Sequence, residues 1–289
     1  MVITGGNSGI GFATATALAR LRADVVITAR TQDRGRAAAD LIEIATGRAV
    51  TPMVLDLASF ASVRSFTVEV ASEIGRVDAL INNAGCYVTP RRTTEDGLEW
   101  TMAVNHLGPF LLTCLLAADP GNRPKRIVNV ASDMHRSAKR DLGFEHLEAP
   151  GRYRGTEAYA RSKLANILFA RELARRLDGT GSVAFSVHPG VVASRIAQDG
   201  DSRLGSIIWK AMARSMLTPE QGAATIVHAA TATGIEDESG GYFAYEVPAE
   251  PHRAACNDTA ANRLWAVSAA LVGCDLDCAR PSEPTTGVA

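Results

Sequence analysis

Short apolar runs rich in β-branched residues alternate with longer amphipathic segments over the first two-thirds of the chain. The runs predict strands at 1–4, 23–30, 49–57, 77–85, 126–132 and 182–190. Hydrophobic residues that recur every three to four positions predict helices near 10–21, 33–46, 59–74, 98–118 and 157–177. Continuously apolar strands are typical of a parallel sheet covered by helices. The alternation therefore predicts an α/β fold, a doubly wound parallel sheet with helices on both faces.

No linker rich in Gly, Pro or Ser divides the chain, and no internal repeat is present. Its 289 residues, 46% of them hydrophobic, are enough for one sizeable core. We therefore expect a single domain over residues 1–280, followed by a flexible tail at 281–289.

Charge and cysteine usage argue against several classes of function. A formal net charge of −1 makes no electrostatic case for nucleic acid or an anionic membrane as partner. The five cysteines have the spacing neither of a zinc site nor of a disulfide framework, so we expect reduced thiols and no metal. The chain opens on a glycine-rich turn and lacks an apolar stretch of about 18 residues. We expect no signal peptide, no transmembrane helix and a cytoplasmic location.

The stretch "TGGNSGIG" at 4–11 lies between the first predicted strand and the first predicted helix. Gly5, Gly9 and Gly11 allow a tight turn and a close approach of the backbone to a ligand. The helix that follows would present its free N–H groups and positive dipole end to a pyrophosphate. Glycines also make ordinary turns, but this strand–turn–helix context predicts a dinucleotide site.

Arg30 stands at the end of the second predicted strand, where proteins that bind NAD usually carry a carboxylate for the ribose 2′-hydroxyl. A guanidinium there would pair with a 2′-phosphate, and Arg34, one helical turn further on, could add to the same site. Two solvated arginines are the simpler alternative. Because no carboxylate ends the strand, we predict NADPH as cofactor.

Two further strand ends carry polar residues. Asp56 ends the third predicted strand and is placed to bind an adenine, and "NNAG" at 82–85 closes the fourth. Ligands of such sheets bind at this edge. An ordinary polar turn would also explain Asn82 and Asn83, but the position favours a functional role for Asn83.

Tyr159 and Lys163 lie four residues apart and therefore on one face of the helix predicted at 157–177. A phenol with a pKa near 10 is a weak acid–base catalyst at neutral pH unless a nearby cation favours the phenolate. Lys163 would supply that charge, which would make Tyr159 a general acid for reduction or a base for oxidation.

These motifs together resemble the short-chain dehydrogenases/reductases. T-G-x-x-x-G-x-G at 4–11, N-N-A-G at 82–85, Ser132 after a strand, Tyr159-x-x-x-Lys163 and Pro189-Gly190 occur in that family's order, over roughly residues 1–195. "VNHLGPFLLT" at 104–113 and "HPGVV" at 188–192 look most like the retinol dehydrogenase and protochlorophyllide reductase-like branch. The resemblance implies a Rossmann-type sheet and, in that branch, mostly NADPH.

The resemblance also implies roles for single residues. The catalytic set would be Asn105, Ser132, Tyr159 and Lys163: Ser132 would hold the substrate oxygen, Lys163 the nicotinamide ribose, and Asn105 a water chain that leads to the lysine. The family commonly has Thr at the position of Ser194, which keeps only the hydroxyl. The residues implied for the cofactor are Gly5, Asn7, Ser8, Gly9, Ile10, Arg30, Arg34, Asp56, Leu57, Asn83, Ala84, Gly85, Tyr159, Lys163, Pro189, Gly190, Val192 and Ser194.

The substrate side is the variable part of this family. The segment at about 193–217 would form a lid over the substrate, and its apolar residues suggest a hydrophobic carbonyl compound, although core packing would explain any one of them. His135 is read as a polar loop residue. The short first strand and the lack of a membrane anchor depart from many retinol dehydrogenases, which makes a membrane-dissolved retinoid less expected.

The sequence predicts an NADPH-dependent reductase of a hydrophobic aldehyde or ketone. The same residues would serve a secondary alcohol dehydrogenase that works in the oxidative direction. A sensor of NADP(H) would be expected to lose Tyr159 or Lys163, and recruitment of the scaffold for non-redox chemistry is disfavoured by the complete set. A homo-oligomer is possible, because the apolar stretch at 262–273 could be core or interface.

Overall fold

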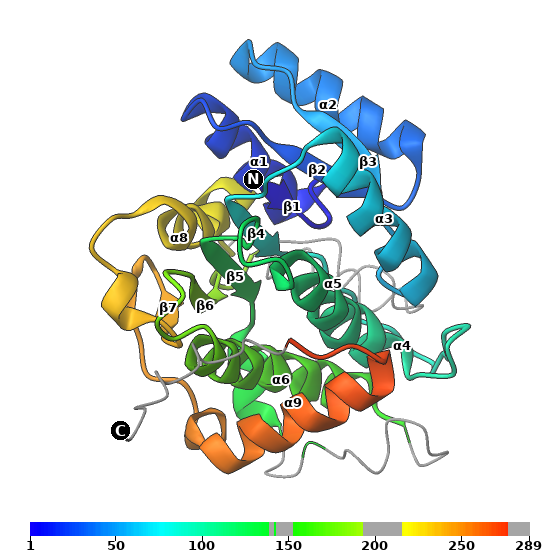
Figure 1. The fold of residues 1–289 in the computed structure, drawn as a ribbon, viewed down its shortest axis with the longest axis vertical. Coiled ribbons are helices and arrows are strands. Elements are labelled where there is room, and N and C mark those ends of the chain that lie inside the picture. The colour runs from blue at the N-terminus through cyan, green and yellow to red at the C-terminus, as the bar shows by residue number, and fades with distance from the viewer. Residues whose placement is uncertain (139–141, 143–152, 193–215, 277–289) are drawn as a thin grey trace, which may run out of the picture.

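The computed structural model describes residues 1–138, 142, 153–192 and 216–276. It contains one eight-stranded sheet in the order β3-β2-β1-β4-β5-β6-β7-β8 (Figure 1). Neighbouring strands run parallel except the β7–β8 pair, which is antiparallel. The strands are β1 (Val2–Ile3), β2 (Val26–Ala29), β3 (Thr51–Val54), β4 (Ala79–Asn82), β5 (Arg126–Val130), β6 (Val183–His188), β7 (Tyr242–Ala244) and β8 (Val247–Pro248).

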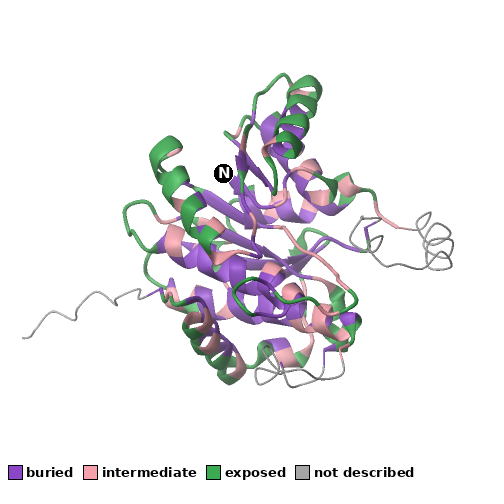
Figure 2. Cartoon of the chain, turned by 90° about the vertical axis from the view of Figure 1, so that its right-hand side faces the viewer, coloured by how far each residue is buried: buried purple, intermediate pink, exposed green. Residues whose placement is uncertain are grey.

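Helices cover both faces of the sheet and form a separate hydrophobic core on each (Figures 1 and 2). Helices α1 (Gly9–Arg20), α2 (Gln32–Thr46) and α8 (Pro219–Thr231) pack on one face. The other face is covered by α3 (Phe60–Glu73), α5 (Gly108–Ala117), α6 (Gly155–Arg176) and α9 (Asp258–Val272). The predicted doubly wound α/β fold is thereby confirmed.

Strand β1 has only two residues, as its few positions before the glycine turn suggested, yet it lies at the centre of the sheet. Val2 and Ile3 are fully buried and pair in parallel with β2 on one side and β4 on the other. The charged N-terminus of Met1 donates a hydrogen bond to the carbonyl of Asp24 at 2.6 Å, which ties the start of the chain to the approach of β2.

The helix predicted at 98–118 contains an irregular turn. It comprises α4 (Trp100–Met102), the π-helical turn η1 (Ala103–Leu107) and α5. A π turn holds one more residue than an α turn, and such turns are frequent at functional sites. Within the described residues, Trp100–Ala117 is also one helical run with the length and composition of a membrane span, but 78% of it is buried inside the protein.

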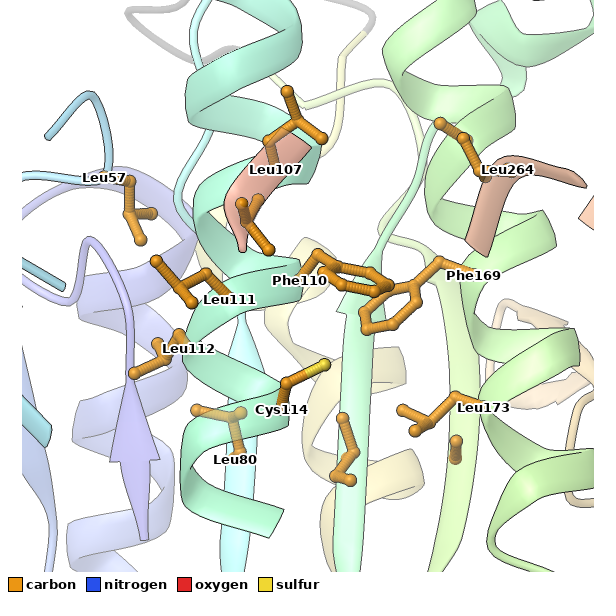
Figure 3. Packing of buried hydrophobic residues seen from close by; sticks show 14 of the residues in the cluster. Leu57, Leu80, Leu107, Phe110, Leu111, Leu112, Cys114, Phe169, Leu173 and Leu264 are labelled. Atoms are coloured by element: carbon orange, nitrogen blue, oxygen red, sulfur yellow. The ribbon is translucent and has the colours of Figure 1, made fainter. Parts of the chain in front are cut away.

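The apolar stretch at 262–273 belongs to α9 and is part of the core. Trp265 is 2% exposed and packs edge-to-face on Phe110 of α5, with ring centroids 4.8 Å apart. Phe169 of α6 lies 5.8 Å from the same indole ring. In Figure 3 the rings of Phe110 and Phe169 lie side by side between α5 and α6.

The β7–β8 hairpin was not predicted, because its strands are too short for an alternating pattern to stand out. The tail at 281–289 and nearly all of the segment at 193–217 lie outside the described residues.

Candidate active site

The candidate residues gather at the carboxyl ends of β1, β4 and β5. The strand order reverses between β1 and β4, because β2 and β3 lie on one side and β5 and β6 on the other. In open α/β sheets, ligands bind in the crevice at such a switch point. The glycine turn follows β1, and Ser132 follows β5, so both predicted motifs lie at this crevice.

The glycine turn is closely packed against the protein at Gly5 and Gly11 but open at Gly9. Gly5 has a φ of +65°, and a Cβ there would lie 3.1 Å from Ala84; a Cβ on Gly11 would lie 2.4 Å from the carbonyl oxygen of Gly5. By contrast, a Cβ on Gly9 would have no protein atom within 4 Å. Ser8 is the N-cap of α1, but its side chain makes no capping hydrogen bond. The first N–H groups of α1 are thus left without a side-chain acceptor, which suits an anionic ligand.

Asn83 supports the glycine turn from below. Its side-chain amide donates to the carbonyl of Thr4 at 2.8 Å, and its backbone N–H donates to the Thr4 hydroxyl oxygen at 3.0 Å. The same oxygen accepts from the N–H of Ala84. Asn82 lies in the core, where it donates to Asn129 and Thr113. The side chains of "NNAG" therefore position the turn and the strand beneath the crevice.

The residues expected to select the cofactor lie along the same edge. Arg30 and Arg34 are both exposed, and neither forms an ion pair within the part of the chain that the structure describes. The carboxylate of Asp56 accepts a hydrogen bond from the N–H of Ala58 at 3.0 Å. The Leu57 side chain is buried, so its contribution to a ligand would come from the backbone.

Tyr159 and Ser132 both lie at the crevice. Tyr159 lies in the first turns of α6, and burial raises the pKa of its phenol to about 12. The nearby Ser132 side chain offsets part of that rise. Ser132 Oγ accepts from the N–H of Met134 at 3.2 Å, which fixes the serine at the start of the 3-10 turn η2 (Asp133–Ser137).

Lys163 lies one turn after Tyr159, with Nζ 5.5 Å from the centre of the tyrosine ring. Nζ donates to the carbonyl of Val130 at 2.9 Å and is 3% exposed. Burial lowers the pKa of Lys163 to about 8. The ammonium is directed at this backbone carbonyl, and its effect on the pKa of Tyr159 stays a prediction.

Asn105 lies in the π turn η1 and is 1% exposed. Its amide donates to the carbonyl of Cys86 and to Ser162 Oγ, at 3.0 and 2.9 Å, and its Oδ1 accepts from the N–H of Cys86. A Cβ on Gly85 would lie 3.4 Å from both Asn105 Oδ1 and Lys163 Nζ. The structure thus places Asn105, Gly85 and Lys163 side by side.

The Pro189-Gly190 turn follows β6 directly and borders the same crevice. Gly190 has a φ of +81°, and a Cβ there would collide with Leu217 at 2.3 Å. Val192 is buried and pairs with Leu217, and a Cβ on Gly222 of α8 would lie 2.5 Å from Val192 and 3.6 Å from Ile10. The turn is therefore packed against the start of α1. Ser194 lies outside the described residues.

Two polar groups behind Ser132 were not anticipated from the sequence. His135, read there as a loop residue, is fully buried. Its Nδ1 contacts the carbonyl of Ser132 at 2.7 Å, and its Nε2 accepts from the N–H of His252 at 3.0 Å, so Nδ1 carries the proton and donates. His135 thereby anchors Ser132. Its position three residues after a strand-end serine was the available signal.

The second group surrounds Asp133. Its Oδ1 accepts from the hydroxyl of Tyr242 at 3.2 Å, and its Oδ2 lies 3.8 Å from His188 Nε2. His188 is buried and has no hydrogen-bond partner on either ring nitrogen among the described residues. His188 precedes Pro189 directly, so this imidazole lies beside Asp133 at the start of the Pro-Gly turn.

The described residues fit a nicotinamide dinucleotide. The open glycine turn and uncapped α1 suit its pyrophosphate, and the Ser132–Tyr159–Lys163 group at the same crevice suits a reacting carbonyl or alcohol.

Comparisons with known proteins agree with this geometry. The family model for short chain dehydrogenases matches residues 1–143. Over 275 residues the chain is 42% identical to retinol dehydrogenase 12 of Homo sapiens, covering 94% of this chain and 86% of that protein.

Solved structures show the same fold. An uncharacterised protein from Mycobacterium paratuberculosis has a TM-score of 0.76 and 32% identity over 95% of this chain and 93% of its own. A blue fluorescent protein from a metagenomic library, solved in complex with NADPH, has a TM-score of 0.63 and 28% identity over 84% and 94%. The chain therefore belongs to the short-chain dehydrogenase/reductase family, in its retinol dehydrogenase-like branch.

Proposed function

We propose that this oxidoreductase uses NADPH to reduce a ketone or aldehyde of a hydrophobic small molecule, with Tyr159 as general acid. The observation that carries the proposal is the group of Ser132, Tyr159 and Lys163, with Lys163 Nζ 5.5 Å from the centre of the tyrosine ring, at the crevice that the open end of α1 also reaches. NADPH would be held by the glycine turn and by Arg30 and Arg34, whose exposed guanidinium groups suit a 2′-phosphate. The NADPH named in a related structure supports this choice.

NADPH, when bound, supplies the hydride. Ser132 orients the substrate oxygen, and Tyr159 donates a proton to the alkoxide that develops on it. Lys163 then stabilises the phenolate formed in this step, because a cation favours the charged form of a neighbouring acid. Asn105 holds the Cys86 backbone beside Lys163. A water chain that is held by Asn105 and relays protons to Lys163 stays a prediction.

The substrate class is inferred from the sequence and the relatives. The hydrophobic lid predicted at 193–217 and the similarity to retinol dehydrogenase 12 both favour an extended apolar molecule with a terminal alcohol or aldehyde. The relative's name favours the oxidative direction as the alternative, in which Tyr159 acts as base. The cytoplasmic location expected from the sequence likewise stays a prediction.

The cofactor choice is tested by fluorescence titration of the wild type and Arg30→Asp with NADPH and NADH. We expect NADPH to bind the wild type at least about tenfold more tightly than NADH, and the variant to lose this preference, because a carboxylate repels the 2′-phosphate. Equal binding of both nucleotides by the wild type would contradict the preference, and binding of neither would contradict the redox function.

The role of Tyr159 is tested with Tyr159→Phe in a screen of apolar aldehydes and ketones. We expect turnover to fall by about 10²-fold or more, since general acid catalysis contributes that much. NADPH affinity should stay within about twofold of the wild type. A variant that turns over normally would rule out Tyr159 as the acid.

A further inference from the structure

Tyr87, an aromatic residue that the proposed mechanism does not use, lies against the tyrosine proposed as the acid. It follows the "NNAGC" stretch at the end of β4. The rings of Tyr87 and Tyr159 meet edge to face, with their centroids 6.0 Å apart and an interplanar angle of 69°. Both residues are partly exposed, so neither ring is enclosed by the core. Tyr87 is therefore a direct neighbour of Tyr159 at the crevice.

The face of α6 that carries Tyr159 shows on which side of it Tyr87 lies. Gly155, Tyr159 and Lys163 follow one another at intervals of four residues and share this face. Lys163 is next to the "NNAG" turn, since a Cβ on Gly85 would lie 3.4 Å from its Nζ. At the other end, a Cβ on Gly155 would lie 3.2 Å from both Cζ and the hydroxyl oxygen of Tyr87. Tyr87 thus lies on the side of Tyr159 opposite to Lys163.

This order assigns the two sides of Tyr159 to different molecules. Under the proposed function, the cofactor lies by the glycine turn and Lys163, and Tyr159 holds the reacting oxygen of the substrate. The rest of the substrate must then extend on the side that the cofactor leaves open. That side is the one where Tyr87 lies.

The backbone on either side of Tyr87 is held in place. Asn105 accepts from the N–H of Cys86 at 2.7 Å and donates to its carbonyl at 3.0 Å. On the other side, the hydroxyl of Tyr153 donates to the carbonyl of Val88 at 3.0 Å. A side chain on a backbone that is already ordered loses little further entropy when a ligand packs against it. Tyr87 is therefore a preformed part of the crevice wall.

We propose that Tyr87 is a specificity-determining residue that admits carbonyl compounds with an unbranched apolar chain at the reacting carbon and excludes those branched beside it. The inference rests on the proposed function, because Tyr159 must hold the reacting oxygen for the chain to pass Tyr87. An unbranched chain can lie along the phenol ring and gain apolar contact. A branch at the neighbouring carbon would collide with the ring, which cannot withdraw because the helix backbone at Gly155 lies directly behind it.

The test compares two isomeric aldehydes, octanal and 2-ethylhexanal, which differ only in the branch beside the carbonyl group. The kcat/KM of the full chain with NADPH is measured for each aldehyde, in the wild type and in Tyr87→Ala. We expect the wild type to prefer octanal by about tenfold or more, which is the scale on which an apolar pocket discriminates. In Tyr87→Ala the ratio should fall to about twofold or less, mainly because 2-ethylhexanal gains.

Two further variants show whether the ring itself selects. Tyr87→Phe keeps the ring and loses the hydroxyl, so it should keep the wild-type ratio of the two kcat/KM values. Tyr87→Leu keeps apolar volume without a ring and should give an intermediate ratio; it also serves as the test if Tyr87→Ala does not fold. The pH profile of kcat for octanal should be the same in all the variants, because the acid is unchanged.

The outcomes separate this inference from the proposed function. An equal fall in kcat/KM for both aldehydes in Tyr87→Ala and Tyr87→Leu would mean that Tyr87 has only a structural role, and the redox function would still stand. Equal turnover of the two isomers by the wild type would overturn the inference in the same way. A wild type that neither reduces the two aldehydes nor oxidises the corresponding alcohols with NADP+ would contradict the proposed function itself, and this inference with it.

Discussion

Lys163 places an ammonium where its surroundings oppose the charge. It is 3% exposed, and among the described residues its hydrogen-bond acceptor is the carbonyl of Val130. That carbonyl also accepts from the side chain of Asn166 at 3.1 Å, so it does not depend on the lysine. A pKa lowered from 10.5 to about 8 corresponds to roughly 3 kcal/mol at ~1.4 kcal/mol per pH unit. The lysine is therefore a cost to stability that catalysis would explain.

Replacing this lysine by an apolar residue of similar length should stabilise the fold. We expect Lys163→Met to raise the free energy of unfolding by about 1–3 kcal/mol at pH 7, while activity is lost. The folded-state pKa is depressed, so the unfolded chain binds more protons between pH 8 and 10.5, and wild-type stability rises through that window. The advantage of the variant should be full below pH 8 and vanish above pH 10.5.

Urea denaturation of the wild type and Lys163→Met measures their free energies of unfolding at pH 7 and near pH 10. Lys163→Gln, which keeps a donor for the carbonyl of Val130, is the matched control and should fall between the wild type and Lys163→Met. If Lys163→Met were less stable than the wild type at pH 7, the lysine would be holding the fold together rather than straining it.

Among the elements, the turn between β1 and α1 depends on two kinds of glycine. Gly11 is required by the protein itself, since a Cβ there would lie 2.4 Å from the carbonyl oxygen of Gly5. Gly9 has a φ of +55° but faces open space, so only a bound ligand would contact a side chain at this position. The two positions therefore separate the demands of folding from those of binding.

This difference predicts two distinct outcomes for alanine variants. Gly11→Ala should lower stability by about 2 kcal/mol or more, because backbone has to move, and NADPH affinity should fall with it. Gly9→Ala should lose only about 1 kcal/mol to left-handed strain, yet NADPH affinity should fall by about tenfold or more. Thermal unfolding and fluorescence titration of both variants make the comparison. Unchanged affinity in Gly9→Ala would mean that no ligand lies against this turn.

The sequence was informative where a pattern is local and long. The six predicted strands and the helices of the first two-thirds are confirmed, because apolar runs and long amphipathic segments alternate there, although β1 keeps only two residues. The pairing of Asn83 with Thr4 could not be predicted, since it joins the ends of two strands that are 79 residues apart. The pKa of Tyr159 could not be predicted either, because burial depends on the packed tertiary structure. The strands of the β7–β8 hairpin are too short to show an alternating pattern.

At the scale of the whole molecule, the two cores enclose several histidines that are neutral in the fold. Burial lowers the pKa of His106 to about 4, and of His135 and His188 below its usual range. His106 links the π turn η1 to α9 through a 2.9 Å contact between Nε2 and Ser268 Oγ. Charging these rings is easier in the unfolded chain, so protonation favours unfolding.

This arrangement predicts an acid-sensitive fold. His106 has a pKa near 6.5 when unfolded and about 4 when folded, so its contribution is full above pH 6.5 and is lost as the pH falls toward 4. The loss amounts to about 3 kcal/mol for this ring alone. Carboxylates with lowered pKa, such as Asp258, act mainly below pH 4.5, which leaves the window from 4.5 to 6.5 to the histidines.

Urea denaturation at half-unit steps from pH 7.5 to 4.5 tests this for the wild type and His106→Gln, whose amide can still reach Ser268. The variant should be less stable at pH 7 because the ring packing is lost, but its curve should fall less steeply below pH 6.5, by up to about 1.4 kcal/mol per pH unit. His228→Gln, at a half-buried position on α8, is the control for the replacement of a histidine by glutamine. Parallel curves for the wild type and His106→Gln would mean that the acid sensitivity originates in other groups, and His135→Gln would then be the next variant to compare.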